Sequence, residues 1–240
     1  MATHLYLAMT AAEYHAAHSL PSHMAWMACH FSPYALGLSN FPEELPDDSI
    51  LILSDLVPVH GHNGEVISRQ LNACIQKHHC RGLLLDFQRA PCSETDILTD
   101  LLLQTVSCPI AVAEPFAQNR SCPVFLPPCP PHIPLKEYLT PWVGREIWLE
   151  TAFSPTVLLL TPSGTKVSPG TGFLPDVHIF EEEQLHCHYQ IQPEAAAVRF
   201  HLQRTADDLS ALIEEGASLG IRQFLGLYQE LGDMSQQFLG

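Results

Sequence analysis

The sequence predicts an α/β protein, an irregular (β/α)8 TIM-like barrel with an antiparallel hairpin insertion near 157–203. Three observations predict this fold. Five short apolar runs have the length and composition of parallel strands buried on both faces. Helical patterns alternate with these runs, and a length of 240 residues matches the usual size of one such barrel. We therefore expect residues 1–240 to form a single TIM-barrel-like domain.

The five apolar runs share a second property, because each finishes on, or one residue short of, an acid or an amide. They are 50–55, 83–88, 110–114, 147–150 and 224–230. In folds built on parallel strands, the carboxyl ends of the strands lie on one rim, where ligands bind. The sequence therefore predicts a polar, acidic site on that rim.

Three segments have the apolar spacing of helices. The first covers 64–79, and the other two begin at capping-box-like pairs, Ser93 with Asp96 and Thr205 with Asp208. Each predicted helix is followed closely by one of the apolar runs. This alternation of helix and strand is typical of a parallel sheet.

The remaining elements make the predicted barrel irregular. Further strands are expected at 24–31 and 123–126, and a hairpin with its turn at 162–164 opens the antiparallel insertion. A second hairpin is expected around Pro193. The proline-rich segment 127–141 cannot form a long helix, so at least one crossover helix is reduced or missing.

An open doubly wound sheet is the alternative fold. It is disfavoured because no Gly-rich phosphate loop of the G-x-G-x-x-G kind follows the first strand region. The sequence thus contains no signal for a cofactor, and we expect none.

The charge balance restricts the class of partner. Eleven Lys and Arg stand against 26 Asp and Glu, a formal net charge of -15, which argues against nucleic acid and against anionic membrane surfaces. No apolar run has the length of a membrane span, and no secretory signal opens the chain. We expect a cytoplasmic protein with reduced cysteines that binds a small polar ligand. The oligomeric state is not predicted.

One apolar run resembles a known motif. Residues 81–88, R-G-L-L-L-D-F-Q, resemble the strand-end signature D-G-x-D-x-D-x-E of family 18 glycoside hydrolases, the chitinase-like TIM barrels. Gly82 and Asp86 match the signature, whereas Arg81, Leu84 and Gln88 replace two aspartates and the glutamate. The last run, at 226–230, is similar to the aromatic-bearing final strand of the family.

The resemblance implies a site with a changed acid. In the family, the glutamate protonates the leaving oxygen and the last aspartate positions the acetamido group of the substrate. The amide of Gln88 cannot donate a titrating proton. Either the protein binds a saccharide or polyol without cleaving it, or another acid such as Glu114 or Glu150 has taken the role.

The candidate site follows from the strand ends and the resemblance. We expect Asp86, Glu114 and Glu150 to be the catalytic candidates. Six further residues are expected to contact the ligand by hydrogen bonds or through an aromatic face: His30, Asp55, Gln88, Trp148, Tyr228 and Glu230.

Two other functions remain open from the sequence. A metal-dependent hydrolase could use the pairs His60 with His62 or His186 with His188, together with Asp55 or Asp86, since alternate residues of a strand share a face. Neither pair has the spacing of a strong zinc motif, so no metal ligand is assigned. The third function is a non-catalytic scaffold, in which the acids lie far apart. Most of the 14 histidines are left without a predicted role.

Overall fold

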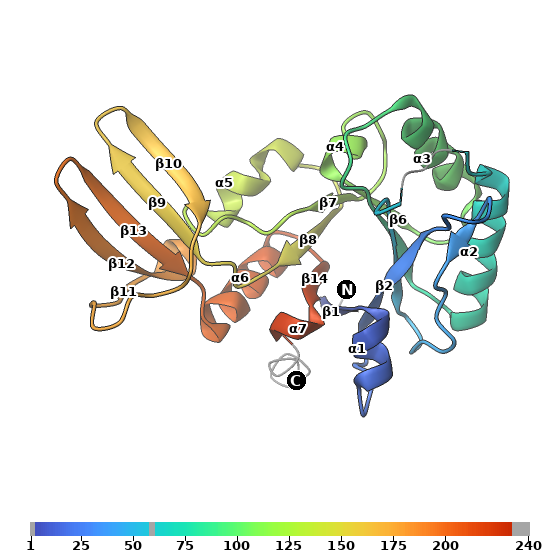
Figure 1. Ribbon diagram of the computed structural model, residues 1–240, viewed down its shortest axis with the longest axis horizontal. Helices are drawn as coiled ribbons and strands as arrows, with labels where there is room; N and C mark the ends of the chain where they lie inside the picture. Colours follow the sequence, from blue (N-terminus) through green and yellow to red (C-terminus); the bar gives the residue numbers. More distant parts are fainter. Residues whose placement is uncertain (1–2, 58–60, 232–240) are drawn as a thin grey trace. The chain divides into compact units, whose positions relative to one another are not determined.

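The computed structural model describes residues 3–57 and 61–231. By its contacts the chain divides into two compact units (Figure 1). The first comprises the described parts of 1–126, 144–150 and 222–240, and the second comprises 127–143 and 151–221. The expectation of a single domain over the whole chain stays a prediction.

The first unit contains a closed barrel of eight strands that follow one another around the ring in chain order. Neighbouring strands from β14 through β1 to β8 pair in parallel, and β1 pairs with both β14 and β2, which closes the ring. The predicted barrel is therefore confirmed, and the open sheet is excluded. The strands are β1 His4–Met9, β2 Met24–Phe31, β4 Ile50–Ser54, β5 Gly82–Asp86, β6 Ile110–Ala113, β7 Val124–Leu126, β8 Ile147–Thr151 and β14 Gln223–Leu227.

Alternate side chains of these strands fill the interior of the barrel. Ile50 and Ile52 of β4 belong to one buried cluster with Leu84 of β5, Phe125 of β7 and Trp148 of β8. Successive residues of a strand point to opposite faces, so this cluster identifies the inward-facing positions. Burying each large apolar side chain stabilises the fold by roughly 1.5–3 kcal/mol.

Two long helices confirm the predicted crossovers in the first unit. The first, α2, covers Gly64–His78 and begins at Asn63, whose side-chain oxygen accepts from the backbone N–H groups of Glu65 and Val66. It ends at His79, which has a left-handed backbone conformation. The second, α3, covers Ser93–Thr105.

The predicted start of α3 was wrong by one position. The N-cap is Cys92, whose backbone N–H donates to the Thr95 hydroxyl over 3.0 Å. Ser93 is already the first helical residue, so its hydroxyl is one position too late to cap the helix. Asp96 instead accepts from Arg120 over 3.0 Å.

Three further crossovers, from β1 to β2, from β2 to β4 and from β6 to β7, contain only short elements. They contain α1 Ala11–Ala16, the two-residue strand β3 Leu38–Ser39, and α4 Glu114–Ala117. The last apolar run was predicted as one strand over 224–230, but β14 ends at Leu227 and the next residues form the helix α7, Tyr228–Leu231. This correction places Tyr228 and Glu230 on a helical turn beyond the strand.

The second unit is built on a five-stranded antiparallel sheet, which confirms the predicted insertion. Its spatial order is β10-β9-β13-β12-β11, and both expected hairpins are present, β9 with β10 and β12 with β13. The strands are β9 Thr156–Thr161, β10 Gly164–Pro169, β11 Phe180–Glu182, β12 Cys187–Glu194 and β13 Ala197–Gln203.

Helices of the second unit flank this sheet in the sequence. The proline-rich segment contains only the short helix α5, Leu135–Leu139, and the 3-10 turn η1, Thr140–Trp142. A second 3-10 turn, η2, covers Glu183–Leu185. The long helix α6 covers Ala206–Ser218, and the predicted capping box of Thr205 and Asp208 is confirmed at its start.

All eight cysteines are free thiols, and six of them are buried. In the described part of the chain, we find no helix with both the length and the apolar character of a membrane span.

Candidate functional site

The carboxyl ends of β2, β4 and β5 bring three polar side chains into one row. The register places His30 beside Ser54 and Ser54 beside Asp86. Ser54 and Asp86 follow the inward-facing Ile52 and Leu84 by two residues, so their side chains also face the interior. His30, as the register partner of Ser54, shares this face.

Glu150 reaches the same interior from the other side of the ring. It follows the inward-facing Trp148 by two residues on β8. Burial, together with the negative charges of Asp86 and Glu230, raises the pKa of Glu150 to about 7. At neutral pH, this carboxyl group therefore carries a proton in a substantial fraction of molecules.

Asp86 accepts a hydrogen bond from Gln88, the residue that stands where the family 18 motif has its glutamate. The amide nitrogen of Gln88 donates to Asp86 Oδ1 over 2.5 Å. Burial raises the pKa of Asp86, the hydrogen bond from Gln88 acts against this rise, and the charge of Asp55 adds to it. Gln88 thus orients an inward-facing carboxyl group.

Asp55 forms hydrogen bonds with the backbone of the loop that follows β5. Its side chain is 1% exposed, and its two oxygens accept from the backbone N–H groups of Gln88 and Arg89, over 2.7 and 3.0 Å. Arg89 Nε in turn donates to the carbonyl oxygen of Asp55 over 2.9 Å. Asp55 therefore positions the loop after β5, and its carboxylate is not at the surface.

Trp148 belongs to the core of the barrel. Its side chain is 2% exposed, and its indole N–H donates to Glu146 over 3.2 Å. The ring lies so close to Gly82 that a Cβ there would stand 2.6 Å from Trp148 Cη2. The indole therefore fills the barrel interior, and its role as a ligand contact stays a prediction.

The other predicted residues are distributed around the rim. Glu230 is exposed on α7, and its charge reaches Glu150. Tyr228 begins the same helix and is half-buried. Glu114 is the first residue of α4, and the charges that act on Glu150 are those of Asp86 and Glu230, not that of Glu114.

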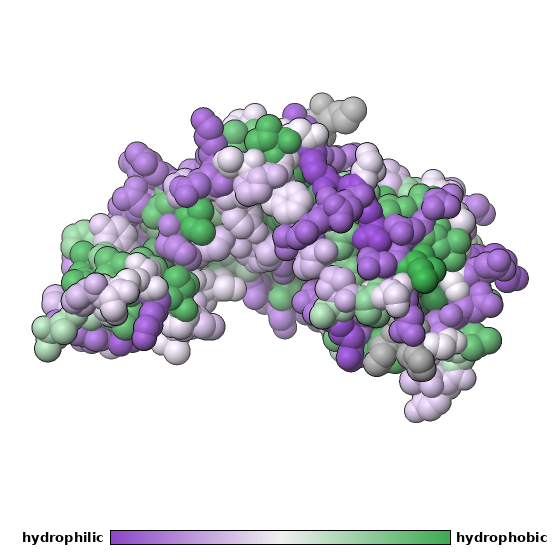
Figure 2. Space-filling view, turned by 90° about the horizontal axis from the view of Figure 1, so that it is seen from above, coloured by the Kyte–Doolittle hydropathy of each residue, from purple (hydrophilic) through white to green (hydrophobic). Residues whose placement is uncertain are grey.

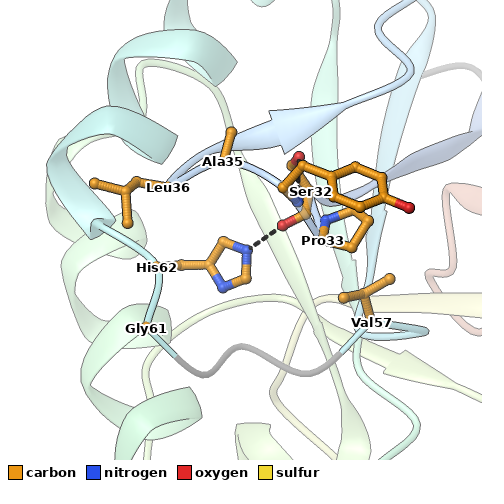
Figure 3. A pocket seen from close by; sticks show the side chains of 8 residues that line it. Ser32, Pro33, Ala35, Leu36, Val57, Gly61 and His62 are labelled. Atoms are coloured by element: carbon orange, nitrogen blue, oxygen red, sulfur yellow. Dashed lines mark hydrogen bonds between the residues drawn. The ribbon is translucent and has the colours of Figure 1, made fainter.

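A hollow of about 480 Å³ opens beside the loop that follows β2 (Figure 3). His62 Nε2 donates to the carbonyl oxygen of Ser32 over 2.9 Å and joins the two loops that form its walls. Tyr34 and Leu36, both lining residues, are 96% and 60% exposed. Neither residue was among the predicted contacts, although a tyrosine and a leucine in a loop directly after a strand are a usable signal.

The expected pairing of histidines on one strand face was wrong for His186 and His188. His186 precedes β12 in a left-handed conformation, so the alternation of a strand does not apply to it. His186 contacts Glu215 over 2.8 Å, and His188 contacts Asp208 over 2.7 Å. His60 lies outside the described residues. Among residues 3–57 and 61–231, no cluster of three or more His, Cys, Asp and Glu side chains could hold a metal ion.

Comparisons with known proteins support the fold. No family model matches the sequence, and no match is found among curated proteins. Solved structures do match over most of the chain, at very low identity. A class V chitinase from Nicotiana tobaccum in complex with NAG4 is 9% identical, with 93% of each chain covered and a TM-score of 0.57.

Two further solved structures are similar. A family 18 N-acetylglucosaminidase from Paenibacillus barengoltzii is 6% identical, covering 93% of this chain and 94% of the other, with a TM-score of 0.58. The spore cortex-lytic enzyme SleL of Bacillus cereus is 9% identical, covering 94% of this chain and 70% of the other, with a TM-score of 0.56. Likeness at such identity shows a shared fold, the fold of these glycosidases.

Proposed function

We propose that this protein is a glycoside hydrolase-like barrel that binds a saccharide at the carboxyl ends of its parallel strands. One observation carries the proposal: Asp86 and Glu150 face the barrel interior from different strands, and the charge of Asp86 acts on Glu150. The fold is shared with a chitinase bound to NAG4 and with an N-acetylglucosaminidase. Saccharides with N-acetyl groups are therefore the first ligand class to test.

Glu150 is the proton donor in this proposal. A general acid needs a pKa near the working pH, so that it carries a proton and can release it to the leaving oxygen. The pKa of about 7 meets this condition. Asp86, which accepts from the Gln88 amide, would position the acetamido group, as the resemblance to family 18 implies.

The remaining contacts come from the rim. His30 shares the inward-facing row with Asp86 and offers a hydrogen bond to sugar hydroxyl groups. Tyr228 and Glu230 of α7 keep their proposed role as ligand contacts. The exposed ring of Tyr34 adds an apolar surface at the end of β2. Asp55 is a positioning residue in this scheme, because its oxygens are used by the loop after β5.

A saccharide-binding protein without hydrolytic activity is the second candidate function. Gln88 is the observation that favours it, since the family motif has its proton-donating glutamate there. The two candidates differ in one measurable property, the turnover of a bound glycan.

Binding to chitin and peptidoglycan fragments, and turnover of a fluorogenic N-acetylglucosaminide, would test the proposal. We expect Glu150→Gln to lower kcat by roughly 10²–10⁴-fold while the affinity for the glycan is kept. Glu65→Gln, the same chemical change on the exposed first turn of α2, serves as the matched control. The turnover of Glu114→Gln is measured in the same way, because Glu114 is the other candidate proton donor.

Each possible result of these measurements has a defined meaning. If none of the glycans binds, the saccharide function is wrong. If the wild type binds but does not turn over, the non-catalytic candidate holds. If Glu114→Gln abolishes turnover and Glu150→Gln leaves it unchanged, the proton donor is Glu114.

A further inference from the structure

The second unit contains a cavity of about 500 Å³ that none of the proposed saccharide contacts lines. It lies between the proline-rich segment and the strands β9 and β10. This volume is in the usual range for small-molecule sites. Because the proline ring fixes the backbone angle φ, the walls are stiff before any ligand binds. Five lining residues are prolines: Pro128, Pro130, Pro131, Pro155 and Pro169.

Arg204, which also lines this cavity, is a buried cation that contacts only neutral acceptors. Its side chain is 5% exposed. Its three nitrogens donate to the backbone carbonyl oxygens of Cys129, His186 and Leu185, over 2.6, 3.1 and 3.4 Å. Among the described residues, no carboxylate lies within ion-pair distance of it.

The hydrogen bonds of Arg204 leave part of its donor capacity unused. A guanidinium group has five N–H donors, and the three bonds to carbonyl oxygens use one donor on each nitrogen. The thiol of Cys129 accepts a further hydrogen bond from Arg204, so one N–H donor remains. That donor can form a charge-assisted hydrogen bond to a carboxylate oxygen, and a bound anion would compensate a charge that is costly to bury without an ion-pair partner.

A second polar group in the lining lacks a partner. The Nδ1 atom of His132 is buried, and no described group forms a hydrogen bond with it. Burial lowers the pKa of His132, so at neutral pH its ring is an uncharged donor and acceptor. Buried polar atoms are normally satisfied. An unsatisfied one in a cavity wall indicates a missing hydrogen-bond partner.

The other side of the cavity is apolar and reaches the surface. Val167 lines the cavity and is 50% exposed. Its register partner is Leu158, which in turn pairs with Phe200, so the three lie side by side on one face of the sheet. Hydrophobic residues are visible at the surface over this sheet, on the left in Figure 2.

We propose that this cavity binds an amphiphilic carboxylate, a small anion with a hydrocarbon body. The carboxylate would pair with Arg204, and the hydrocarbon would lie between the prolines and Val167. All lining residues belong to the second unit. The inference is therefore independent of the saccharide site in the barrel.

Calorimetric titration of the full chain with straight-chain carboxylates, from butyrate to decanoate, would test the proposal. We expect affinity to rise about fourfold for each added CH₂ until the cavity is full. The matched primary alcohols should bind at least roughly tenfold more weakly than the carboxylates, because an alcohol cannot form a charge-assisted hydrogen bond to Arg204. Absence of carboxylate binding, or equal affinity for carboxylates and alcohols, would overturn the proposal.

A substitution at the mouth of the cavity locates the binding. Replacing Arg204 would remove three backbone contacts and endanger folding, so the test uses Val167→Glu. The matched control is Thr165→Glu, which adds the same charge on the same exposed face of β10 but outside the lining.

We expect Val167→Glu to weaken octanoate binding roughly tenfold or more, by desolvation and like-charge repulsion. Thr165→Glu should change it by about twofold at most in buffer with salt. Equal affinities in both variants would assign the binding to another place and contradict the proposal.

Discussion

Glu150 combines two physical effects in one side chain, since it is removed from water and lies near other acids. Both effects disfavour its ionised form and raise its pKa to about 7. The same shift that suits a proton donor carries a cost in stability. The native state binds the proton of Glu150 more tightly than the unfolded chain does, so ionisation of this group opposes folding.

The stability of the protein is therefore expected to fall as the pH rises from the ordinary glutamate value towards 7. The shift from 4.5 to about 7 corresponds to at most about 3 kcal/mol. Urea unfolding at about pH 5 and about pH 8 should show a larger loss of unfolding free energy for the wild type than for Glu150→Gln. Glu65→Gln should behave as the wild type does. If the unfolding free energies of the wild type and Glu150→Gln changed with pH in the same way, the raised pKa of Glu150 would be wrong.

Gly82, one of the two residues that match the family 18 motif, lies where packing leaves no room for a larger side chain. An added Cβ would stand 2.6 Å from Trp148 Cη2 and 3.3 Å from the carbonyl oxygen of Pro109. We expect Gly82→Ala to destabilise the fold by about 1–3 kcal/mol through overpacking. Combined with Trp148→Leu, it should cost less than the sum of the two single variants, because the clash is then absent. Strict additivity in chemical unfolding would show that Gly82 and Trp148 are not coupled.

At the scale of elements, Asp208 joins α6 to β12. Its Oδ2 atom accepts from the backbone N–H and the hydroxyl group of Thr205, over 2.7 and 2.8 Å, and contacts His188 Nδ1 over 2.7 Å. Burial alone would raise the pKa of Asp208, but these hydrogen bonds outweigh it, and the pKa lies below its ordinary value. Asp208 therefore stabilises the fold at pH values above its ordinary pKa. This stabilisation is lost as the pH falls through the lower pKa of Asp208 in the folded state.

Asp208→Ala should destabilise the second unit by about 2 kcal/mol, because it removes a helix cap and leaves half-buried donors without their acceptor. Hydrogen exchange at neutral pH should become faster in α6 and β12. The exposed neighbour provides the control, since Asp207→Ala keeps all of these contacts. Unchanged exchange in Asp208→Ala would mean that α6 is held mainly by its apolar face.

Element boundaries show where sequence patterns stop being informative. The long periodic helices α2, α3 and α6 are predicted well, because many residues contribute to the same pattern. The end of β14 is not, since Leu227 and Tyr228 continue the apolar run while the backbone turns into α7. The two residues that meet at that boundary, a leucine and a tyrosine, both occur readily in strands. Only the position of the next packing partner distinguishes them.

At the scale of the whole molecule, the net charge of -15 disfavours the compact state through self-repulsion. Raising NaCl from about 20 mM to about 300 mM should stabilise the protein by about 1 kcal/mol, or roughly 2–4 °C in Tm. An uncharged osmolyte at equal osmolality tests whether the effect is electrostatic. A Tm that falls with salt would show that attractive ion pairs outweigh the repulsion.

By itself, the sequence determined the class of the fold, the rim on which to look for a site, and the acids that end the strands. Those features depend on local periodicity and on the direction of parallel strands, both of which are readable along the chain. The tertiary structure alone decided which acids meet. Asp86 and Glu150 face the same interior, Asp55 supports a loop, and Trp148 is core, because burial and approach across the ring depend on strand register and side-chain direction. Those properties join residues far apart in the chain, and no local pattern records them.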